Sequence, residues 1–163
     1  MVGCDFNPRW FWTVENIEAI TKLLPQLESP IIHICSGISK IGDIRLDRSY
    51  LNIPLDRPAY SNRNRGNPNI KGDMENTPFK DSVAGSIICD PPYKYDFTKK
   101  ELINELVRIC KPRGKIVFIA PWIPNHKAIK VINTDLWKVG RNGAYHKIRT
   151  MFYKSNGQIG DYI

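Results

Sequence analysis

One tetrapeptide of the sequence, Asp90-Pro91-Pro92-Tyr93, combines an acid, a rigid backbone and an aromatic ring. An exocyclic amine is a poor nucleophile because its lone pair is delocalised into the ring, and acceptors that hold both amine hydrogens favour the reactive pyramidal form. The Asp90 carboxylate and the Pro91 carbonyl can supply these acceptors, since consecutive prolines make a stiff loop that keeps both aimed at one target. Tyr93 offers a flat face for a base flipped from its stack. These residue types predict chemistry on a planar amine.

The tetrapeptide follows an apolar run at residues 86–90, which predicts a buried strand that ends in an acid. Further strands are predicted at residues 31–35, 43–47, 69–73 and 115–120, with two more around 136–139 and 148–153 and a turn at 140–143. Helical spacing predicts helices at 14–27, where Pro25 should end or bend the helix, at 98–109, and near 126–131. This alternation predicts one α/β domain over residues 1–163, with an open, mostly parallel sheet flanked by helices and an antiparallel C-terminal hairpin.

Two stretches depart from a regular alternation of strands and helices. Only residues 36–42 separate the first two strands, which is too few for a helical crossover, so we expect a compact fold with a shortened first crossover. Residues 54–69 hold prolines, asparagines and three arginines without a helical period, and this composition predicts a long basic loop.

Polar or small residues follow each of the first four predicted strands. Ser36-Gly37 follows the first, Asp47 ends the second, Asp73 ends the third, and Asp90 ends the fourth. Ligands of open α/β sheets bind at the carboxyl ends of the strands, where the strand order reverses. We therefore expect these residues to form one site.

Together these features resemble the Rossmann-like class I S-adenosylmethionine-dependent methyltransferases, in particular the D-P-P-Y amino-methyltransferases that include adenine and cytosine DNA methylases. The resemblance covers roughly two thirds of the chain. Residues 72–79 are similar to the family's G-D-x-x-x-x-P-F passage, and Lys111-Pro112-Arg113-Gly114 is similar to its K-P-x-G turn.

The resemblance implies S-adenosylmethionine as cofactor and assigns residues to it. Cys35, Ser36 and Gly37 would approach the amino acid moiety, with Ser39 or Lys40 holding it if the first crossover lacks its helix. By the same resemblance Asp47 would hold the ribose hydroxyls, Asp73 with Met74 the adenine, and Asp90 would lie between cofactor and target. The sulfonium is already activated, so direct transfer needs positioning and electrostatics, and we expect neither a metal nor a covalent enzyme intermediate.

Composition predicts a globular protein, and its basic charge fits either a polyanionic partner or simple solubility. The 163 residues are 42% hydrophobic, carry a formal net charge of +8 and contain no apolar run long enough to span a bilayer. Four widely spaced cysteines without metal-ligand spacing favour buried thiols in a reducing cytoplasm. The residues expected to contact nucleic acid are Arg57, Arg63, Arg65, Lys94, Trp122 and Arg141.

The motif specifies the reaction better than it specifies the substrate. Adenine N6 in DNA is the first hypothesis, and cytosine N4 or an RNA base are alternatives; a protein glutamine is less favoured because that branch usually has Asn at the position of Asp90. A non-catalytic nucleic-acid-binding subunit is the alternative from another class. No separate recognition domain is predicted, so the loops at 54–69 and 140–147, a homodimer or a partner protein would supply specificity.

Three tryptophans have open roles in the sequence, and one histidine has an expected structural role. Trp12, like Trp10, could cover the cofactor or a base, although an aromatic residue near a terminus more often fills the core. Trp122 follows a strand on the expected catalytic side and fits the core or the substrate equally well. His33, within an apolar strand, is expected to be a hydrogen-bonded core histidine.

Overall fold

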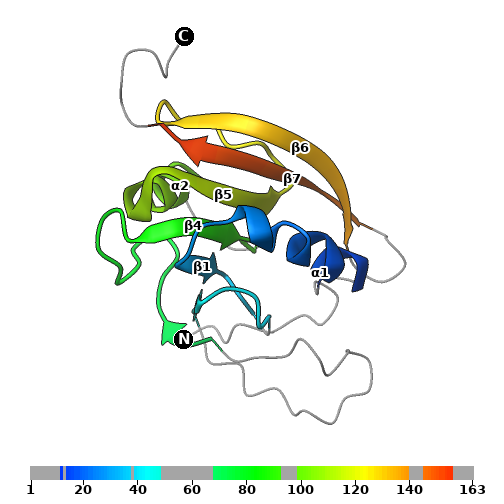
Figure 1. Ribbon diagram of the computed structural model, residues 1–163, viewed down its shortest axis with the longest axis horizontal. Coiled ribbons are helices and arrows are strands. Elements are labelled where there is room, and N and C mark those ends of the chain that lie inside the picture. The colour runs from blue at the N-terminus through cyan, green and yellow to red at the C-terminus, as the bar shows by residue number, and fades with distance from the viewer. Residues whose placement is uncertain are drawn as a thin grey trace.

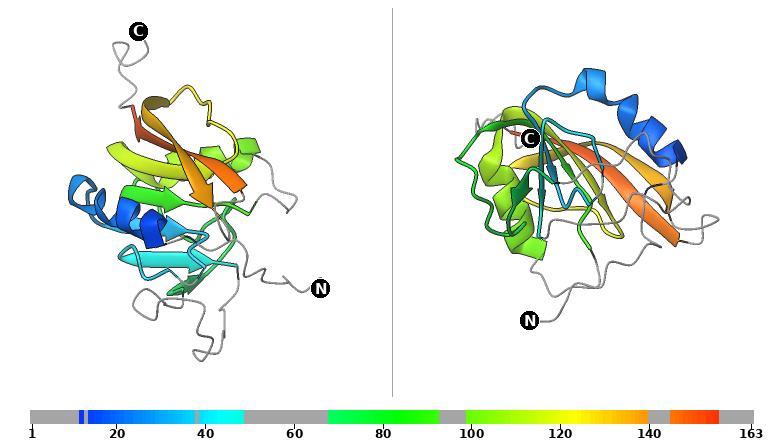
Figure 2. Two further views of the ribbon diagram at one scale, coloured as in Figure 1. Left: turned by 90° about the vertical axis from the view of Figure 1, so that its right-hand side faces the viewer. Right: turned by 90° about the horizontal axis from the view of Figure 1, so that it is seen from below.

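The computed structural model describes residues 12, 14–37, 39–48, 68–92, 99–139 and 145–155. In this part of the chain one seven-stranded sheet has the strand order β3-β2-β1-β4-β5-β7-β6. Helix α1 lies against one face of the sheet and helix α2 against the other (Figures 1 and 2). The described residues therefore form a three-layer α/β fold.

The first five strands run parallel to one another. They are β1 Ile31–Ile34, β2 Ile44–Asp47, β3 Ile70–Lys71, β4 Ala84–Cys89 and β5 Cys110–Ala120. β1 pairs with β2 on one side and with β4 on the other, so the chain builds one half of the sheet before it returns to start the second half. β4 is buried along its whole length, as a central parallel strand should be.

The last two strands, β6 Ile129–Val139 and β7 Tyr145–Lys154, form an antiparallel hairpin. β7 also pairs antiparallel with β5, which places it between β5 and β6. The predicted mostly parallel sheet with an antiparallel C-terminal hairpin is confirmed. The structure adds that the final strand is inserted into the sheet, and that β6 forms its edge.

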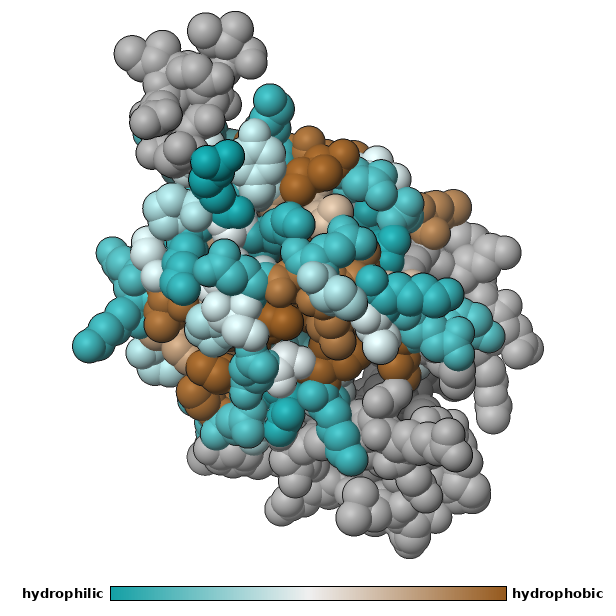
Figure 3. Space-filling view, in the orientation of Figure 1, coloured by the Kyte–Doolittle hydropathy of each residue, from teal (hydrophilic) through white to brown (hydrophobic). Residues whose placement is uncertain are grey.

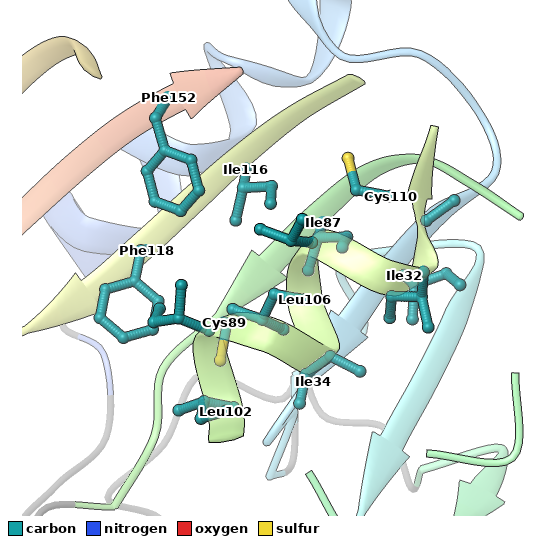
Figure 4. Close-up of a cluster of buried hydrophobic side chains, with 14 of the residues drawn as sticks. Ile32, Ile34, Ile87, Cys89, Leu102, Leu106, Cys110, Ile116, Phe118 and Phe152 are labelled. Atoms are coloured by element: carbon teal, nitrogen blue, oxygen red, sulfur yellow. The ribbon is translucent and has the colours of Figure 1, made fainter. Parts of the chain in front are cut away.

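Helix α2, Lys99–Ile109, covers one face of the sheet with its apolar side. Because side chains alternate along a strand, every second strand residue points toward this helix. The fully buried strand residues of this cluster include Ile32, Ile34, Ile87, Cys89, Ile116 and Phe118, and Leu102, Leu106 and Ile109 of α2 pack on them (Figure 4). Full burial of each large aliphatic side chain stabilises the fold by about 1.5–3 kcal/mol, so this cluster is a main source of stability.

Helix α1, Val14–Thr21, and the 3-10 helix Leu24–Gln26 lie on the opposite face. Ile20 is buried there among the alternate residues of the central strands, which are Ile31, Ile88, Val117 and Ile119. On this side of the molecule, shown in Figure 3, hydrophilic side chains cover much of the surface and apolar ones gather in patches between them. The prediction of one helix over 14–27 was too long, because Pro25 cannot continue the α-helical hydrogen-bond pattern and lies in the 3-10 helix instead.

One other prediction of local structure was wrong. Residues 126–131 do not form a helix, because β-branched residues from Ile129 onward join β6, which pairs with β7. The turn expected at 111–114 is present as an irregularity inside β5, because Cys110 pairs with Ala84, Arg113 has a φ of 63°, and regular pairing with β4 resumes at Lys115. Gly114 is required there, since a Cβ would lie 2.7 Å from the carbonyl oxygen of Gly85.

The first crossover is short and, in its described residues, without a helix, as predicted. Asp43 ties the end of this crossover to the start of β1, because its Oδ2 accepts hydrogen bonds from the backbone N of Ile31 at 2.7 Å and from Ser29 Oγ at 2.9 Å. Gly42 turns the chain with a φ of +100°, and a Cβ there would lie 3.1 Å from His33 Cβ. Neither α1 nor α2 is long and apolar enough to cross a membrane.

Candidate active site at the carboxyl ends of the strands

The order of strands reverses between β1 and β4. From β1 the chain proceeds to β2 and β3 on one side, whereas β4 leads to β5 on the other. The residues after these strands lie at one edge of the sheet, which is where ligands bind in open α/β folds. Cys35 follows β1, Asp47 ends β2 and Asp90 follows β4, so the structure places these three predicted site residues at the switch point.

A tight turn follows β1. Cys35 and Gly37 have φ values of 58° and 52°, and the backbone N of Ser36 donates to the carbonyl of Leu46 at 3.1 Å. A Cβ added at Gly37 would meet no atom of the described residues within 4 Å. Ser36 is only 4% exposed, and among the described residues its Oγ has no hydrogen-bond partner. Buried hydroxyls are normally paired, so Ser36 is an exception within the described part of the chain.

Asp47 connects the end of β2 to this turn. Its Oδ2 accepts a hydrogen bond from the backbone N of Gly37 at 2.8 Å, and its Oδ1 accepts one from the backbone N of Arg48 at 2.7 Å. Backbone donors from two loops therefore fix the carboxylate beside the glycine turn. The structure brings Asp47 and Gly37 together, as the predicted cofactor site requires.

Two sulfur-containing side chains, Cys35 and Met74, contact each other beside the turn after β1. Cys35 Sγ lies 3.4 Å from Met74 Sδ, and both side chains pack against the α2-side core. A hydrogen bond with Cys89 and burial hold the pKa of Cys35 well above its usual range. The Cys35 thiol is therefore protonated. Cys89 and Cys110 are buried thiols, as predicted, whereas Cys35 is half-buried and Cys4 lies outside the described residues.

Asp73 follows β3 at the outer side of the same edge. Its Oδ1 accepts a hydrogen bond from the backbone N of Glu75 at 2.9 Å, and its Oδ2 lies 3.4 Å from Arg48 Nη2. The Asp73 carboxylate is 44% exposed and Arg48 is 69% exposed, so this ion pair adds little stability. Asp73 and its neighbour Met74 are thus held in a loop next to β2, with the carboxylate open to solvent.

The loop that carries Asp73 and Met74 is anchored to α2. Glu105 Oε1 accepts hydrogen bonds from the backbone N and Oγ1 of Thr77, at 2.7 and 2.6 Å. Arg108 donates from Nε to Glu105 Oε2 at 2.7 Å and from Nη2 to the Phe79 carbonyl at 2.9 Å. Burial alone would raise the pKa of Glu105, but the hydrogen bonds from Arg108 and Thr77 outweigh it and lower that pKa. This anchor was not predicted, because Glu105 and Arg108 are far apart in sequence from their partners Thr77 and Phe79.

Asp90 is half-buried and lies under the indole of Trp12. Trp12 Nε1 donates to Asp90 Oδ2 at 2.6 Å. The indole stacks on the His33 ring, with centroids 5.3 Å apart and planes 19° apart. Of the rest of the predicted catalytic tetrapeptide, Pro91 is buried and Pro92 half-buried, and Tyr93 lies outside the described residues.

His33 supports this arrangement from within β1. Burial lowers its pKa to about 4, so the ring is neutral at neutral pH. Its Nδ1 lies 3.0 Å from the Ile41 carbonyl oxygen, whereas Nε2 has no partner in the described part of the chain. His33 is thus a core histidine, as expected, but it is paired through one nitrogen only.

Trp122 is the one predicted nucleic-acid contact that the structure describes. It follows β5, is half-buried, and makes an edge contact with Phe118 at a centroid distance of 4.9 Å. Lys99 Nζ lies 5.0 Å from the centre of its ring. The other expected contacts, Arg57, Arg63, Arg65, Lys94 and Arg141, lie outside the described residues. Ser39, expected as a possible cofactor ligand, accepts a hydrogen bond from the backbone N of Ile41 at 3.1 Å.

The sequence left the role of Trp12 open, and the structure places this residue in the site next to Asp90. A period of two along β4 places Asp90 on the same face as Ile88, which is the α1 face. Trp12 lies two residues before α1 and so reaches this face. Among the described residues, no three His, Cys, Asp or Glu side chains gather into a metal-binding group.

No protein-family model matches the sequence, and no curated protein does. Solved structures match the fold. A structure from work on the conversion of a disulfide bond into a thioacetal group during echinomycin biosynthesis has a TM-score of 0.60 at 11% identity, covering 88% of this chain and 84% of that one. A SAM-dependent methyltransferase from Methanosarcina mazei has a TM-score of 0.52 at 8% identity, with 82% and 97% covered. One from Aquifex aeolicus has a TM-score of 0.51 at 12% identity, with 84% and 88% covered.

At these low identities the likeness concerns the fold. The chain has the Rossmann-like fold that these SAM-dependent methyltransferases share, and the predicted fold class is confirmed.

Proposed function

We propose that this protein binds S-adenosylmethionine at the carboxyl ends of β1 and β2 and transfers its methyl group to an exocyclic amino nitrogen of a base in DNA, adenine N6 first. The observation that carries this proposal is the position of Asp90-Pro91-Pro92. It follows the central strand β4 at the switch point, next to the glycine turn after β1. The fold shared with SAM-dependent methyltransferases supports the cofactor.

The residues present fit such a cofactor. Among the described residues, Ser36 Oγ has no partner and a Cβ at Gly37 would meet no atom within 4 Å, which suits a polar group that approaches the backbone, as the methionine moiety would. Asp47 is a carboxylate fixed by backbone donors and suits the ribose hydroxyls. The Met74 side chain and the exposed carboxylate of Asp73 suit an adenine ring and its amine. When bound, the cofactor supplies the methyl group on an activated sulfonium.

The chain's own groups would prepare the amine. Asp90 at the end of β4 and the adjoining Pro91 carbonyl offer two acceptors from neighbouring residues, and the proline backbone limits how far they can move apart. Holding both amine hydrogens turns the nitrogen lone pair toward the cofactor, and positioning of this kind supplies much of the acceleration in such transfers. No nucleophilic side chain is needed for this step.

Charge supports a nucleic acid as the substrate. The chain carries a formal net charge of +8. Exposed Arg48 follows β2 and exposed Lys71 ends β3, both at the edge of the sheet that holds the site. Exposed Lys99 begins α2. Cationic side chains around a site attract phosphate groups and make binding dependent on salt.

The test is a methylation assay with isotopically labelled S-adenosylmethionine and separate pools of duplex DNA, single-stranded DNA and RNA, followed by identification of the modified nucleoside. Label in N6-methyladenine from DNA is the expected result. Label in N4-methylcytosine, or in RNA only, would change the proposed substrate but keep the proposed reaction. Cofactor binding without transfer to any pool would contradict catalysis and favour a non-catalytic nucleic-acid-binding subunit.

A further inference from the structure

Asp90 accepts one hydrogen bond from a distant part of the chain. Strand alternation turns its side chain to the α1 face, the same face as His33, whose register partner on β4 is Ile88. Trp12 approaches from just before α1 and donates its indole N–H to Asp90 Oδ2 at 2.6 Å, across 78 positions of sequence. A hydrogen bond to a carboxylate is among the stronger ones in proteins.

The indole itself is held in place. It stacks on His33 with the ring planes 19° apart, and His33 is only 1% exposed, with Nδ1 next to the Ile41 carbonyl. The His33 ring on which the indole stacks is uncharged at neutral pH, because burial lowers the pKa of His33. The donor on Asp90 therefore belongs to a packed stack, whereas the terminal torsion of an isolated Asp side chain is only weakly restricted.

We propose that Trp12 is a positioning residue that fixes the plane of the Asp90 carboxylate in the orientation that receives the substrate amine. The inference rests on the proposed function of Asp90 as an amine acceptor. Each carboxylate oxygen has more than one lone pair, so a hydrogen bond from Trp12 leaves Asp90 able to accept an amine hydrogen as well. Trp12 acts through Asp90, and the stack with His33 gives it the rigidity that this role requires.

The contact can be tested without any assay of activity. Labelling with 15N-tryptophan gives one indole N–H signal for each of the four tryptophans. Trp12→Phe removes one signal and thereby assigns it. In Asp90→Ala that signal should move to lower proton frequency, because the indole proton loses a hydrogen bond to a charged oxygen. An unmoved signal would overturn the proposal.

Kinetics test the consequence. Trp12→Phe keeps an aromatic ring on His33 and removes the donor, so kcat should fall about tenfold, while KM for the nucleic acid and the Kd of S-adenosylmethionine stay within about twofold. The matched control is Ser29→Ala, which removes a hydrogen bond to the Asp43 carboxylate before the other end of β1 and should leave kcat unchanged.

The outcomes separate this inference from the proposed function. A raised KM with unchanged kcat in Trp12→Phe would make Trp12 a substrate contact, and a raised kcat would make it a cover over the site; either result overturns the positioning role. If Asp90→Ala methylates as fast as the unaltered protein, the proposed mechanism fails, whereas the indole signal still reports whether Trp12 binds Asp90.

Discussion

Two carboxylates, Glu105 and Asp90, lie on opposite faces of the sheet in clusters of different construction. Glu105 is 7% exposed, and Thr77 and Arg108 together fill its oxygens with hydrogen bonds. Around Asp90 the cluster consists of aromatic rings, and within the described part of the chain His33 Nε2 and, in the adjoining turn, Ser36 Oγ have no hydrogen-bond partner. Saturated polar clusters stabilise a fold, whereas a binding site needs polar groups that the fold itself has not saturated.

The comparison predicts that mutation of Asp90 affects activity, whereas mutation of Glu105 affects stability. Asp90→Ala should lower methyl transfer by about a thousandfold, because it removes an acceptor made for the transition state, while the midpoint of thermal unfolding changes little. Rates from labelled-methyl transfer and melting by circular dichroism measure both effects. Strong loss of stability with retained activity would reverse the assignment of the two faces.

The Asp90 side should also respond to pH differently from the Glu105 side. The pKa of His33 falls from its usual 6.5 in the unfolded chain to about 4 in the folded one, so the unfolded chain binds the extra proton between these values. Stability that is present above pH 6.5 should be lost as pH falls to about 4, at a cost of about 3 kcal/mol. Urea unfolding at several pH values tests this, and His33→Phe should flatten the slope in that window. An equal slope in the variant would exclude His33 as its source.

On the other face, Glu105→Ala should lower the free energy of unfolding by about 2–3 kcal/mol, because it leaves the partners on Thr77 and Arg108 without an acceptor. Since the folded pKa of Glu105 is lowered, its contribution is present above the usual Glu pKa and is lost at more acidic pH than that of His33. Glu101→Ala, on the exposed side of α2, is the matched control and should stay within about 0.5 kcal/mol. Similar losses in both variants would contradict a specific role for Glu105.

The smallest expected effect concerns the cofactor. Asp47→Asn should weaken S-adenosylmethionine binding by about tenfold, because an amide replaces one acceptor of the ribose hydroxyls with a donor. Isothermal titration calorimetry measures the Kd. Asp81→Asn, an exposed acid on the Arg108 side, is the control. Unchanged affinity in Asp47→Asn would remove Asp47 from the cofactor site.

The site was predictable to the extent that it depends on strand ends. An alternating segment that stops at Asp47 and an apolar run that stops at Asp90 identify both acids, because strands leave a periodic or continuous hydrophobic signal and parallel sheets bind ligands at their carboxyl ends. Helix boundaries were less predictable, since the β-branched residues of 129–131 suit either a helix or a strand until β7 supplies a partner. The role of Trp12 remained ambiguous, because the sequence around an aromatic residue does not distinguish one that fills the core from one that lines a site.

By itself, the sequence determined the fold class, the shortened first crossover and the tetrapeptide at the end of β4, because periodicity and turn residues are local properties. The tertiary structure alone decided that β7 lies between β5 and β6, that Glu105 and Arg108 hold the loop at Thr77, and that Trp12 binds Asp90. Each of these depends on contacts between residues far apart in the chain, and such contacts exist only once the sheet has brought the segments together.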